Sequence, residues 1–427
     1  MRHLYNLLTY LLLIPFAFYW LFRGISNRSY LDRLSQRFGF GFPKLDGCIW
    51  VHAVSVGEVQ AAVPLIQSLS ERYPQQTLLI TTVTPTGAAR VPALFGDRVR
   101  HCYIPFEFPN AVRSFFSSVR PSAAMIMETE IWPNLYRGCG IRGIPLVLVS
   151  ARISPRSIPG YRRLLPLIRE TLSHGIIIAA QSQADADRFI ELGANVQRTM
   201  VTGNIKFDVK PDPAIAENGK RLRETLFGAR RVWIAASTHD GEEQQVLETH
   251  RILMAKHPDL LLILVPRHPE RFSGVRDLIE SEAFNVVSRT EQRPCDASTE
   301  VFLVDTMGEV PLFYAASDIA FVGGSLVPIG GHNLLEPAAQ GLPIVTGPHL
   351  FNALDIAEKF IELGACRIAA DSTGLATIIA ELIDNPEEAA RIGRDGLKVL
   401  QQNRGSLKRL LILLEPLLDE RGSSGPP

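Results

Sequence analysis

The sequence predicts an α/β protein with two parallel, doubly wound sheets, and three observations indicate that class. Short apolar runs typical of strands alternate with longer helical patterns along most of the chain. The chain has 427 residues, more than one hydrophobic core usually organises, so two domains are expected. The segment Lys210 to Ala214, which holds two prolines, interrupts the alternation near the middle. Two α/β domains joined in this way imply a cleft between them for two substrates.

The first element is an apolar segment, Leu4 to Phe22, that carries no charged residue. It is just long enough to span a bilayer as one helix, and its aromatic residues also suit the membrane interface. We therefore expect residues 1–22 to be a membrane anchor that either spans the bilayer or lies in its surface. A cleavable signal peptide is the alternative, but no small-x-small cleavage site follows. The basic residues that follow place the rest of the chain on the cytoplasmic side; they are Arg23, Arg28, Arg33 and Arg37.

The first domain is expected over residues 23–206, where six apolar runs predict strands. These runs are Gly47–Ala53, Thr77–Thr82, Ala123–Met127, Leu146–Val149, Gly175–Ala180 and Thr199–Gly203. Residues 207–220 are expected to be a linker. The second domain is expected over residues 221–427, with strands at Val232–Ala236, Leu261–Val265, Val301–Val304, Ile319–Val322 and Pro343–Val345. A final helical pattern, Leu407 to Leu418, is expected to brace the two domains.

Composition excludes several classes of function. The 44 basic and 44 acidic residues balance, so a nucleic-acid partner is not expected. The five cysteines are scattered without metal-binding spacing, which indicates a reducing compartment and no structural zinc. The pair Asp185 and Asp187 has the spacing of a metal-binding motif, but its helical, polar context favours a surface position. We expect no metal and no bound cofactor.

A glycine-rich stretch follows the strand at Ile319–Val322 and is the most informative feature of the second domain. It runs from Gly323 to Glu336, with glycine pairs at each end of a short loop before a helix start. Glycine lets a backbone approach a phosphate closely, Asn333 or His332 can begin the helix, and free N–H groups there favour an anion. Glu336 is placed to accept hydrogen bonds from a ribose diol. A packing turn with a capped helix is the alternative.

Polar residues follow other strands of the same domain, where an α/β sheet places its ligand site. Arg267, after one strand, is the candidate for the donor phosphate or base. The backbone of Met307 and Gly308, after another, is a candidate for reading a nucleobase. A third group spans Ala236 to Glu243 and includes His239.

In the first domain, Glu58 lies in the first turn of a helix that follows the first strand. It can act as a general base, although the helix N-terminus is expected to lower its pKa. An ordinary first-turn glutamate is the equal alternative. Glu128 and Glu130 follow a later strand, and we expect at most one of them to face the cleft while the other caps a helix. Four arginines are candidates for phosphates on an acceptor, or form a solvated basic face: Arg152, Arg156, Arg162 and Arg163.

Several of these motifs, taken in order, resemble the 3-deoxy-D-manno-octulosonic acid (Kdo) transferases of lipopolysaccharide synthesis. The resemblance rests on Ser55–Glu58, Met127–Asn134, Pro266–Arg271 and Gly323–Ser325. It implies the GT-B glycosyltransferase fold, with two Rossmann-like domains facing a cleft. It also implies inverting transfer of Kdo from CMP-Kdo to the lipid A precursor (lipid IVA) on the cytoplasmic side of the inner membrane.

The resemblance assigns roles to residues that match the family's motifs. Glu58 is the implied proton acceptor, and the implied contacts to CMP are Pro266, Arg267, Met307, Gly308, Glu309, Asn333, Leu334, Leu335 and Glu336. Two alternatives are a nucleotide-sugar epimerase of the same fold and a non-catalytic, membrane-tethered sensor of sugar nucleotides. The anchor disfavours the epimerase, and the acidic residue at the cleft edge disfavours the sensor.

Overall fold

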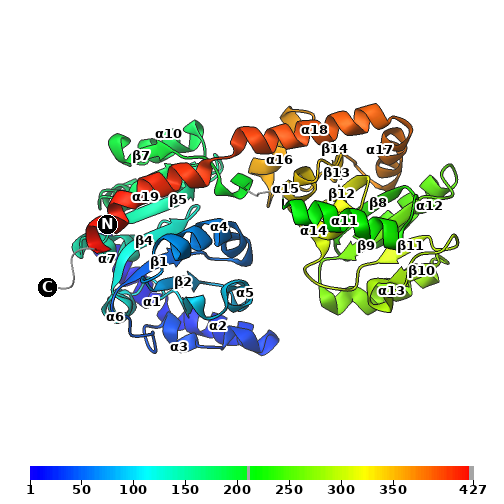
Figure 1. The fold of residues 1–427 in the computed structure, drawn as a ribbon. Helices are drawn as coiled ribbons and strands as arrows, with labels where there is room; N and C mark the ends of the chain where they lie inside the picture. The colour runs from blue at the N-terminus through cyan, green and yellow to red at the C-terminus, as the bar shows by residue number, and fades with distance from the viewer. Residues whose placement is uncertain (209–211, 423–427) are drawn as a thin grey trace. The chain divides into compact units, whose positions relative to one another are not determined.

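The computed structural model describes residues 1–208 and 212–422. The chain divides into two compact units, Met1–Asp208 with Arg404–Pro427, and Val209–Asn403. Each unit is built around one parallel sheet, as Figure 1 shows. The sequence expectation of two parallel-sheet α/β domains is confirmed.

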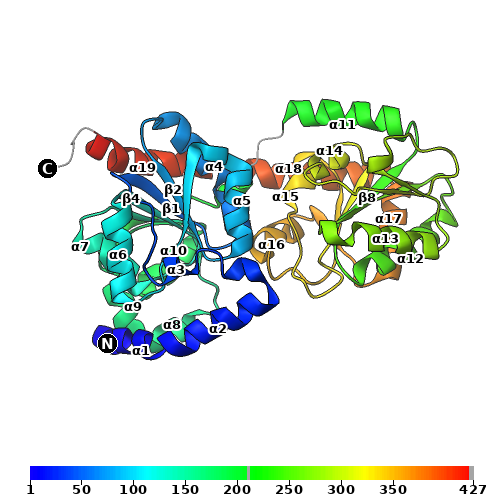
Figure 2. The same cartoon turned by 90° about the horizontal axis from the view of Figure 1, so that it is seen from below.

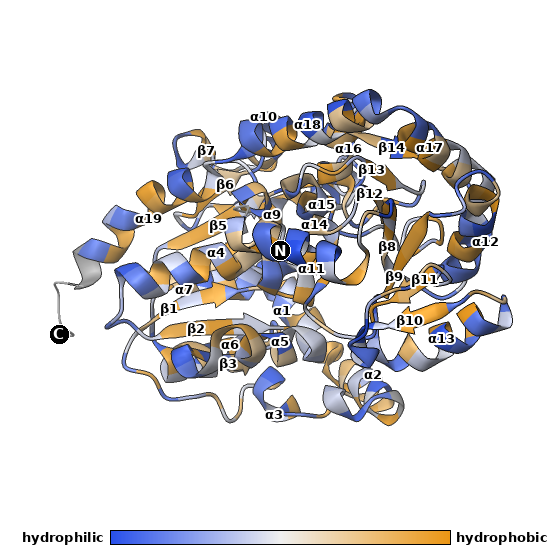
Figure 3. Cartoon of the chain, turned by 45° about the vertical axis from the view of Figure 1, so that its right-hand side comes forward, coloured by the Kyte–Doolittle hydropathy of each residue, from blue (hydrophilic) through white to orange (hydrophobic). Residues whose placement is uncertain are grey.

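The first unit has a seven-stranded sheet in the order β3-β2-β1-β4-β5-β6-β7, with every neighbouring pair parallel. The strands are β1 Cys48–His52, β2 Leu78–Thr82, β3 Val99–Tyr103, β4 Pro121–Met127, β5 Leu146–Ala151, β6 Ile177–Ala180 and β7 Thr199–Val201. Central strands such as β1 are buried along their whole length, since helices cover both faces of the sheet. Figure 3 shows these central strands as hydrophobic.

Helices α6, α7, α9 and α10 contribute to the core on one face of this sheet, and α4, α5 and α19 to the core on the other. Their bounds are α4 Val56–Arg72, α5 Pro85–Phe95, α6 Pro109–Val119, α7 Pro133–Ile141, α9 Leu165–Leu172, α10 Gln183–Glu191 and α19 Ser406–Gly422. Two shorter helices are α3 Leu34–Arg37 and α8 Ile158–Arg163. Because consecutive residues of a strand point to opposite faces, Trp50 enters the first core and Val51 the second.

The second unit repeats this design with the order β10-β11-β9-β8-β12-β13-β14, again entirely parallel. The strands are β8 Val232–Thr238, β9 Leu261–Pro266, β10 Val286–Ser288, β11 Val301–Leu303, β12 Ile319–Val322, β13 Ile344–Thr346 and β14 Cys366–Ile368. The helices are α11 Pro213–Leu226, α12 Glu242–Met254, α13 Phe272–Ser281, α14 Val310–Ala315, α15 Leu335–Ala339, α16 Leu354–Glu362, α17 Ser372–Asp384 and α18 Pro386–Asn403.

The N-terminal segment forms two helices, α1 Arg2–Leu11 and α2 Leu13–Ser26, instead of the single helix expected over Leu4 to Phe22. Within the described residues no single helix is long and apolar enough to cross a membrane. The two together pass by length and composition but are bent by 46° at their junction. Figure 2 shows both in blue along the first unit.

Polar and aromatic contacts fasten this helix pair to the first unit. Arg2 pairs with Glu170 at 2.6 Å, and the Tyr5 hydroxyl lies 3.1 Å from Glu107. Trp20 is 6% exposed and packs in a small core with Phe106 and Phe108. Other large side chains of the pair point to solvent. The segment is therefore a docked, amphipathic element rather than a free anchor.

Arg37, which we counted among the basic residues after the anchor, is fully buried. Its guanidinium lies 4.2 Å from the ring centre of Trp20 and 4.0 Å from that of Tyr103. Burial lowers the pKa of Arg37 to about 10, although neighbouring tyrosines oppose that effect. This arginine packs against Trp20 and so stabilises the docking of α2 on the first unit. Because it is buried, it adds no charge to the surface.

The ends of the second unit differ from the expected domain bounds. Of the expected linker 207–220, residues 209–211 lie outside the described residues, and helix α11 already begins at Pro213 behind the cap Asp212. Helix α19 belongs to the first unit, where Leu410, Leu414 and Leu418 join its core. The apolar period of α19 predicts a helix with a buried face, but it does not reveal which domain core that face enters.

Close backbone packing in the second unit yields a stability prediction. A Cβ atom on Gly393, in the buried part of α18, would lie 2.0 Å from the carbonyl oxygen of Gly341. We expect Gly393→Ala to lower the melting temperature of the second unit by at least about 3 °C, through overpacking. Differential scanning calorimetry of the full chain measures this change.

The matched control is Gly274→Ala in α13, where an added Cβ meets no atom within 4 Å. Alanine has the higher helix propensity, so this variant should gain up to about 1 kcal/mol. Equal melting temperatures for the two variants would contradict the packing argument.

Candidate active site

The strand orders define where each unit can hold a ligand. Both orders reverse beside a central strand, between β1 and β4 in the first unit and between β8 and β12 in the second. In open parallel sheets, ligands bind beyond the carboxyl ends of the strands at such a reversal. Glu58 follows β1, and the glycine-rich stretch follows β12, so both candidate groups lie at these points.

Glu58 lies in the first turn of α4 and is half-buried. Its Oε2 atom accepts a hydrogen bond from the backbone N–H of Val54 at 2.8 Å, and no other group among residues 1–208 and 212–422 bonds to its carboxylate. The pKa of Glu58 is raised to about 8. Burial is the largest cause and the charges of Glu128 and Glu130 add to it, while the Val54 hydrogen bond and Lys206 oppose the rise. The expected lowering of its pKa was wrong, because lost hydration outweighs the helix dipole.

Glu128 and Glu130 lie beyond β4, and both act on Glu58 electrostatically. We expected them to face opposite ways in an extended segment, but Glu128 has a left-handed backbone with φ 58°. That turn breaks the alternation of side chains. Burial favours a higher pKa for Glu128, but its ion pairs with Lys206 at 2.6 Å and Arg152 at 3.1 Å lower the pKa overall.

Glu130 differs from Glu128 in having no cation beside it in the described structure. Its Oε2 atom accepts a hydrogen bond from the indole N–H of Trp132 at 2.7 Å. Burial raises the pKa of Glu130, the Trp132 bond lowers it and the charge of Glu128 raises it. Three neighbouring carboxylates thus have different environments, and only Glu128 is neutralised by cations.

Neither glutamate caps α7, as we had expected one of them to do. Glu107, from the loop between β3 and α6, accepts the backbone N–H groups of Asn134 at 2.6 Å and Leu135 at 3.0 Å. Burial raises the pKa of Glu107 to about 7, although these hydrogen bonds and Arg2 oppose it. Sequence reasoning missed this residue, since nothing local places Glu107 near the start of α7.

Lys206 was also missed, although one sequence signal was available. It follows the last strand of the first sheet, β7, and so lies at the same sheet edge as Glu58. Its N–H bond to Asn204 and its ion pair with Glu128 hold it there.

The four arginines do not form one cluster. Arg152 pairs with Glu128 at 3.1 Å and Arg162 with Glu191 at 2.6 Å. Arg156 and Arg163 are exposed, and neither has an ion-pair partner within the described part of the chain. The hypothesis that arginines bind phosphates on the acceptor therefore applies best to Arg156 and Arg163. Asp185, which we placed on the surface, is buried and accepts the N–H of Ile153 at 3.1 Å.

The glycine-rich stretch has the predicted order of strand, loop, helix and strand, as β12, an irregular loop, α15 and β13. Its first N–H groups, however, are not free for a phosphate. The buried carboxylate of Glu242, at the start of α12, accepts hydrogen bonds from Gly324 at 2.7 Å, Ser325 at 3.0 Å and Leu326 at 2.9 Å. It also accepts the N–H of His239 at 3.2 Å. A protein carboxylate therefore occupies the anion cradle at this end of the loop.

The far end of the loop leads into α15, which is a single short helix of five residues. The cap residue of α15 is Leu334, not Asn333 or His332, although Asn333 Oδ1 accepts the N–H of Leu335 at 3.0 Å beside it. Leu334 and Leu335 are buried, and Asn333 also bonds to Glu336 at 3.1 Å. Burial raises the pKa of Glu336, whereas Asn333 and the charge of Arg267 lower it.

Arg267 directly follows β9, whose last residue is the buried Pro266. Its backbone N–H bonds to Thr238 of β8 at 3.0 Å, which places the two strand ends together. Its charge acts on Glu336, so the structure brings these two predicted donor residues close. Among the described residues, the Arg267 guanidinium forms no ion pair.

Met307, Gly308 and Glu309 lie beyond β11, at the start of α14. Met307 is 57% exposed, and Gly308 has open space where a side chain would be. The carboxylate of Glu309 accepts hydrogen bonds from Arg289 at 3.0 Å and from the Thr306 hydroxyl. The Glu309 carboxylate is therefore engaged within the protein, while Met307 is exposed and the space beside Gly308 is open.

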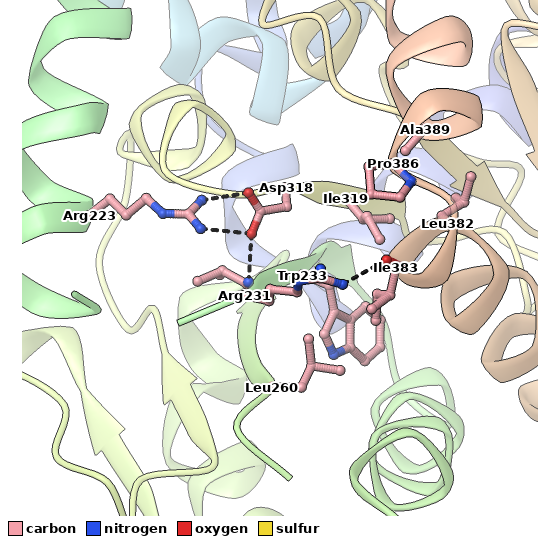
Figure 4. A pocket seen from close by; sticks show the side chains of 11 residues that line it. Arg223, Arg231, Trp233, Leu260, Asp318, Ile319, Leu382, Ile383, Pro386 and Ala389 are labelled. Carbon is pink, nitrogen blue, oxygen red and sulfur yellow. Dashed lines mark hydrogen bonds and ion pairs between the residues drawn. The ribbon is translucent and has the colours of Figure 1, made fainter. Parts of the chain in front are cut away.

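A hollow of about 220 Å³ lies at the opposite edge of the second sheet, beside the first residues of β8 and β12 (Figure 4). Arg223 forms two 2.8 Å bonds to Asp318 there, and Asp318 accepts the N–H of Val232. These contacts hold the first residues of β8 and β12 together. The hollow lies at the amino ends of these strands, whereas a donor nucleotide is expected beyond their carboxyl ends. No group of three or more His, Cys, Asp or Glu within residues 1–208 and 212–422 could hold a metal ion.

The fold consists of two parallel-sheet α/β domains and resembles that of the GT-B glycosyltransferases. The structure of Anabaena Alr3699/HepE in complex with UDP matches with a TM-score of 0.56 at 17% identity, over 87% of this chain and 100% of that one. UDP-GlcNAc 2-epimerase from Neisseria meningitidis matches with a TM-score of 0.58 at 14% identity, over 86% of this chain and 100% of that one. At such identities these likenesses concern the fold alone.

Sequence relatives define the family. A family model described as 3-deoxy-D-manno-octulosonic-acid transferase (kdotransferase) matches residues 32–209. The 3-deoxy-D-manno-octulosonic acid transferase of Haemophilus influenzae is 42% identical over 93% of this chain and 94% of its own length. That of Bordetella pertussis is 36% identical over 87% of each chain. The chain belongs to the 3-deoxy-D-manno-octulosonic acid transferase family, as its motifs led us to expect.

The role of Glu242 can be tested by replacing its carboxylate with an amide. We expect Glu242→Gln to destabilise the protein by about 1.5–3 kcal/mol, since at least one buried N–H loses its charged acceptor. Thermal unfolding measures this loss, and calorimetric titration with CMP should show weaker binding.

Glu248→Gln is the matched control, because Glu248 is exposed on the same helix. It should change neither the unfolding temperature nor CMP affinity. Wild-type behaviour of Glu242→Gln in both measurements would contradict the assignment of this carboxylate to the loop.

Proposed function

We propose that the protein moves Kdo from CMP-Kdo to the lipid A precursor lipid IVA, with inversion at the anomeric carbon. Membership of the Kdo transferase family supports the transferred sugar. The observation that carries the mechanism is Glu58, whose half-buried carboxylate has a raised pKa and a single hydrogen bond within the described structure. The acceptor, the stereochemistry and the residue roles are the proposal.

Glu58 is the best proton acceptor of the three neighbouring glutamates. Glu128 is neutralised by Lys206 and Arg152, and Glu130 is bonded to Trp132. Glu58 keeps its Oε1 atom free of bonds from the described residues, and a raised pKa makes its carboxylate a stronger base.

The reaction proposed is one direct displacement. The acceptor hydroxyl oxygen attacks the anomeric carbon, the bond from that carbon to the phosphate oxygen breaks, and the electron pair leaves with CMP. The hydroxyl proton passes to Glu58. Attack from the side opposite the leaving phosphate inverts the anomeric centre. Arg267, whose guanidinium forms no ion pair with the described residues, is the proposed partner of the departing phosphate.

The donor contacts proposed are the residues that the motifs indicate. Arg267 and Glu336 lie close enough to act on one another, Met307 is exposed, and the space beside Gly308 is open. We propose that CMP is contacted by Pro266, Arg267, Met307, Gly308, Glu309, Asn333, Leu334, Leu335 and Glu336.

The deciding experiment incubates the full chain with CMP-Kdo and lipid IVA and follows the products by mass spectrometry. Addition of one or more Kdo units supports the proposal and counts them. Donor isomerisation without transfer would indicate an epimerase, and donor binding without any product would indicate a sensor. Either of these outcomes overturns the proposal.

The proposed base predicts a specific pattern for Glu58→Gln. The amide can still accept the Val54 N–H but cannot take a proton, so transfer should fall by about 10²–10⁴-fold. Glu71→Gln, at an exposed position late in the same helix, is the control and should keep full activity. Near-normal transfer by Glu58→Gln would exclude Glu58 as the base.

The pH dependence of activity and stability follows from the same carboxylate. Only ionised Glu58 accepts a proton, so kcat/KM should rise with pH, reach half its maximum near the free-enzyme pKa of about 8 and level off above it. The folded pKa lies above the ordinary glutamate pKa of 4.5, so this group favours folding fully below pH 4.5 and loses that contribution as pH rises through 8. Glu58→Gln should therefore be at least as stable as the wild type at pH 8.

We also propose that α1 and α2 bind the cytoplasmic surface of the inner membrane. The polar bonds of Arg2, Tyr5 and Asn6 to the first unit favour a helix pair lying in the interface over one crossing the bilayer. The outward side chains supply the apolar face, and they include Leu4, Leu7, Leu8, Leu11, Ile14, Phe18, Phe22 and Ile25. A lipid acceptor fits this placement.

Membrane binding can be tested by flotation with vesicles of anionic and zwitterionic phospholipids. Phe18 and Phe22 are 68% and 71% exposed, so replacing both with Ser should reduce the bound fraction at least about tenfold, at roughly 1.5–3 kcal/mol for each buried Phe. Phe40→Ser is the control, since Phe40 is equally exposed, at 68%, but lies outside the pair. Unchanged flotation of the double variant would contradict the proposed face.

A further inference from the structure

Three imidazoles meet beyond the carboxyl ends of the second sheet, and the proposed mechanism uses none of them. His239 follows β8, His268 follows β9 and His332 lies in the glycine-rich loop. The Nε2 atoms of His239 and His332 are 2.7 Å apart, and their rings stack with centres 5.0 Å apart. The ring of His268 meets that of His239 edge-on at 5.3 Å.

The contact between His239 and His332 can hold one proton. At 2.7 Å, one ring nitrogen must donate a hydrogen and the other must accept it. A second proton on this line would place two N–H groups face to face. The pair therefore keeps this hydrogen bond while it is neutral, and also after one further proton adds to an Nδ1 atom; only a second added proton would force a ring to turn away.

The surroundings favour the neutral pair when no anion is bound. Burial lowers the pKa of His239, and the charges of His268, Arg267 and Arg271 lower it further. Burial likewise lowers the pKa of His332 to about 3, with contributions from His239, Arg267 and His268.

The neighbouring carboxylates are already engaged. Glu242 binds backbone N–H groups, including that of His239 itself. Asp240 and Glu243 pair with Arg271 at 3.0 and 2.6 Å, and Glu336 bonds to Asn333. In the part of the chain that the structure describes, Arg267 has no ion-pair partner. The cluster thus combines one uncompensated cation with imidazoles that lack a counter-ion.

The loop backbone is shaped to receive these rings. A Cβ atom on Gly324 would lie 2.8 Å from the His332 ring and 3.4 Å from that of His239. Gly324 also has φ 66°, in the region that favours glycine. The two rings therefore lie against bare backbone, held by the same loop that Glu242 fastens.

We propose that His239 and His332 bind the donor's phosphate, and that the pair takes up one proton as the anion arrives. This inference rests on the proposed function, since it assumes a cytidylate donor. An anionic oxygen beside Arg267 would stabilise an imidazolium, and the protonated ring would donate an N–H to it. As the bond from sugar to phosphate breaks, negative charge grows on that oxygen, so the same cation stabilises the leaving group.

The anionic oxygen has two possible sources in the donor, the phosphate and the carboxylate of the sugar acid. Cytidine 5′-methylphosphate separates them, because it carries the phosphate without the sugar acid. As a phosphodiester it does not titrate between pH 6 and 8, so any pH dependence of its binding belongs to the protein. Cytidine, which has no phosphate, reports on the nucleoside contacts alone.

The experiment is calorimetric titration of the full chain in detergent, at pH 6 to 8 and in two buffers of different ionisation enthalpy. We expect the wild type to bind cytidine 5′-methylphosphate more tightly as pH falls, with net proton uptake. His239→Gln and His332→Gln should bind it about tenfold more weakly at pH 6, which equals about 1.4 kcal/mol, with a flat pH profile. Both should bind cytidine like the wild type.

His257→Gln is the matched control, because His257 lies before β9, at the other end of the strands, and should behave like the wild type. Wild-type affinity and proton uptake in the two histidine variants would overturn the inference. So would variants that lose affinity for CMP-Kdo but not for the methylphosphate, since that assigns the pair to the carboxylate. Failure to bind any cytidine ligand would instead overturn the proposed donor.

Discussion

Burial of both faces of every central strand is the constraint on which the rest of the molecule depends. A strand covered by helices on each side has no solvent face, so its polar neighbours can lie only at its ends. Because all strands of each sheet are parallel, the residues after them collect at one edge. Glu58, Glu128 and Lys206 come from distant segments but meet there for this reason. In the second unit, His239, Arg267 and the glycine-rich loop meet in the same way.

At these edges the hydrogen-bond and ion-pair partners of each carboxylate determine its pKa and its role. Glu242 is fully buried, yet four backbone N–H groups satisfy it, and it serves as a fastening for the loop. Glu128 is satisfied by two cations. Glu58 has neither arrangement, so burial outweighs its single Val54 hydrogen bond and the charge of Lys206 and raises its pKa to about 8. A carboxylate that is costly to ionise is the one suited to receive a proton.

Strand positions were predictable where strands are central and apolar, and the missed ones lie at sheet edges. β3, β10 and β14 are edge strands, and β3 includes Arg100 and His101, which break the apolar run. Edge strands are half-exposed and tolerate polar residues, so periodicity does not reveal them. The residues at strand ends were predictable for the same topological reason that placed Glu58 and Arg267. The pKa of Glu58 was not, because it depends on burial and on Glu128 and Glu130, which local sequence does not place.

Long-range side-chain contacts account for the remaining differences between the sequence predictions and the structure. Glu107 illustrates the difficulty, since it caps α7 from a different loop and also bonds to Tyr5 of α1. Asn134, in the first turn of α7, bonds in turn to Asn6 of α1. The segment Glu130 to Trp132 therefore leads into a helix start that is tied to the N-terminal helices by two independent polar contacts. The N-terminal helices, which we propose bind a lipid surface, thereby also help to set the position of the loop beside Glu58. With the lipid acceptor proposed above, this arrangement would join the acceptor-side loop and the proposed membrane-binding helices in one unit.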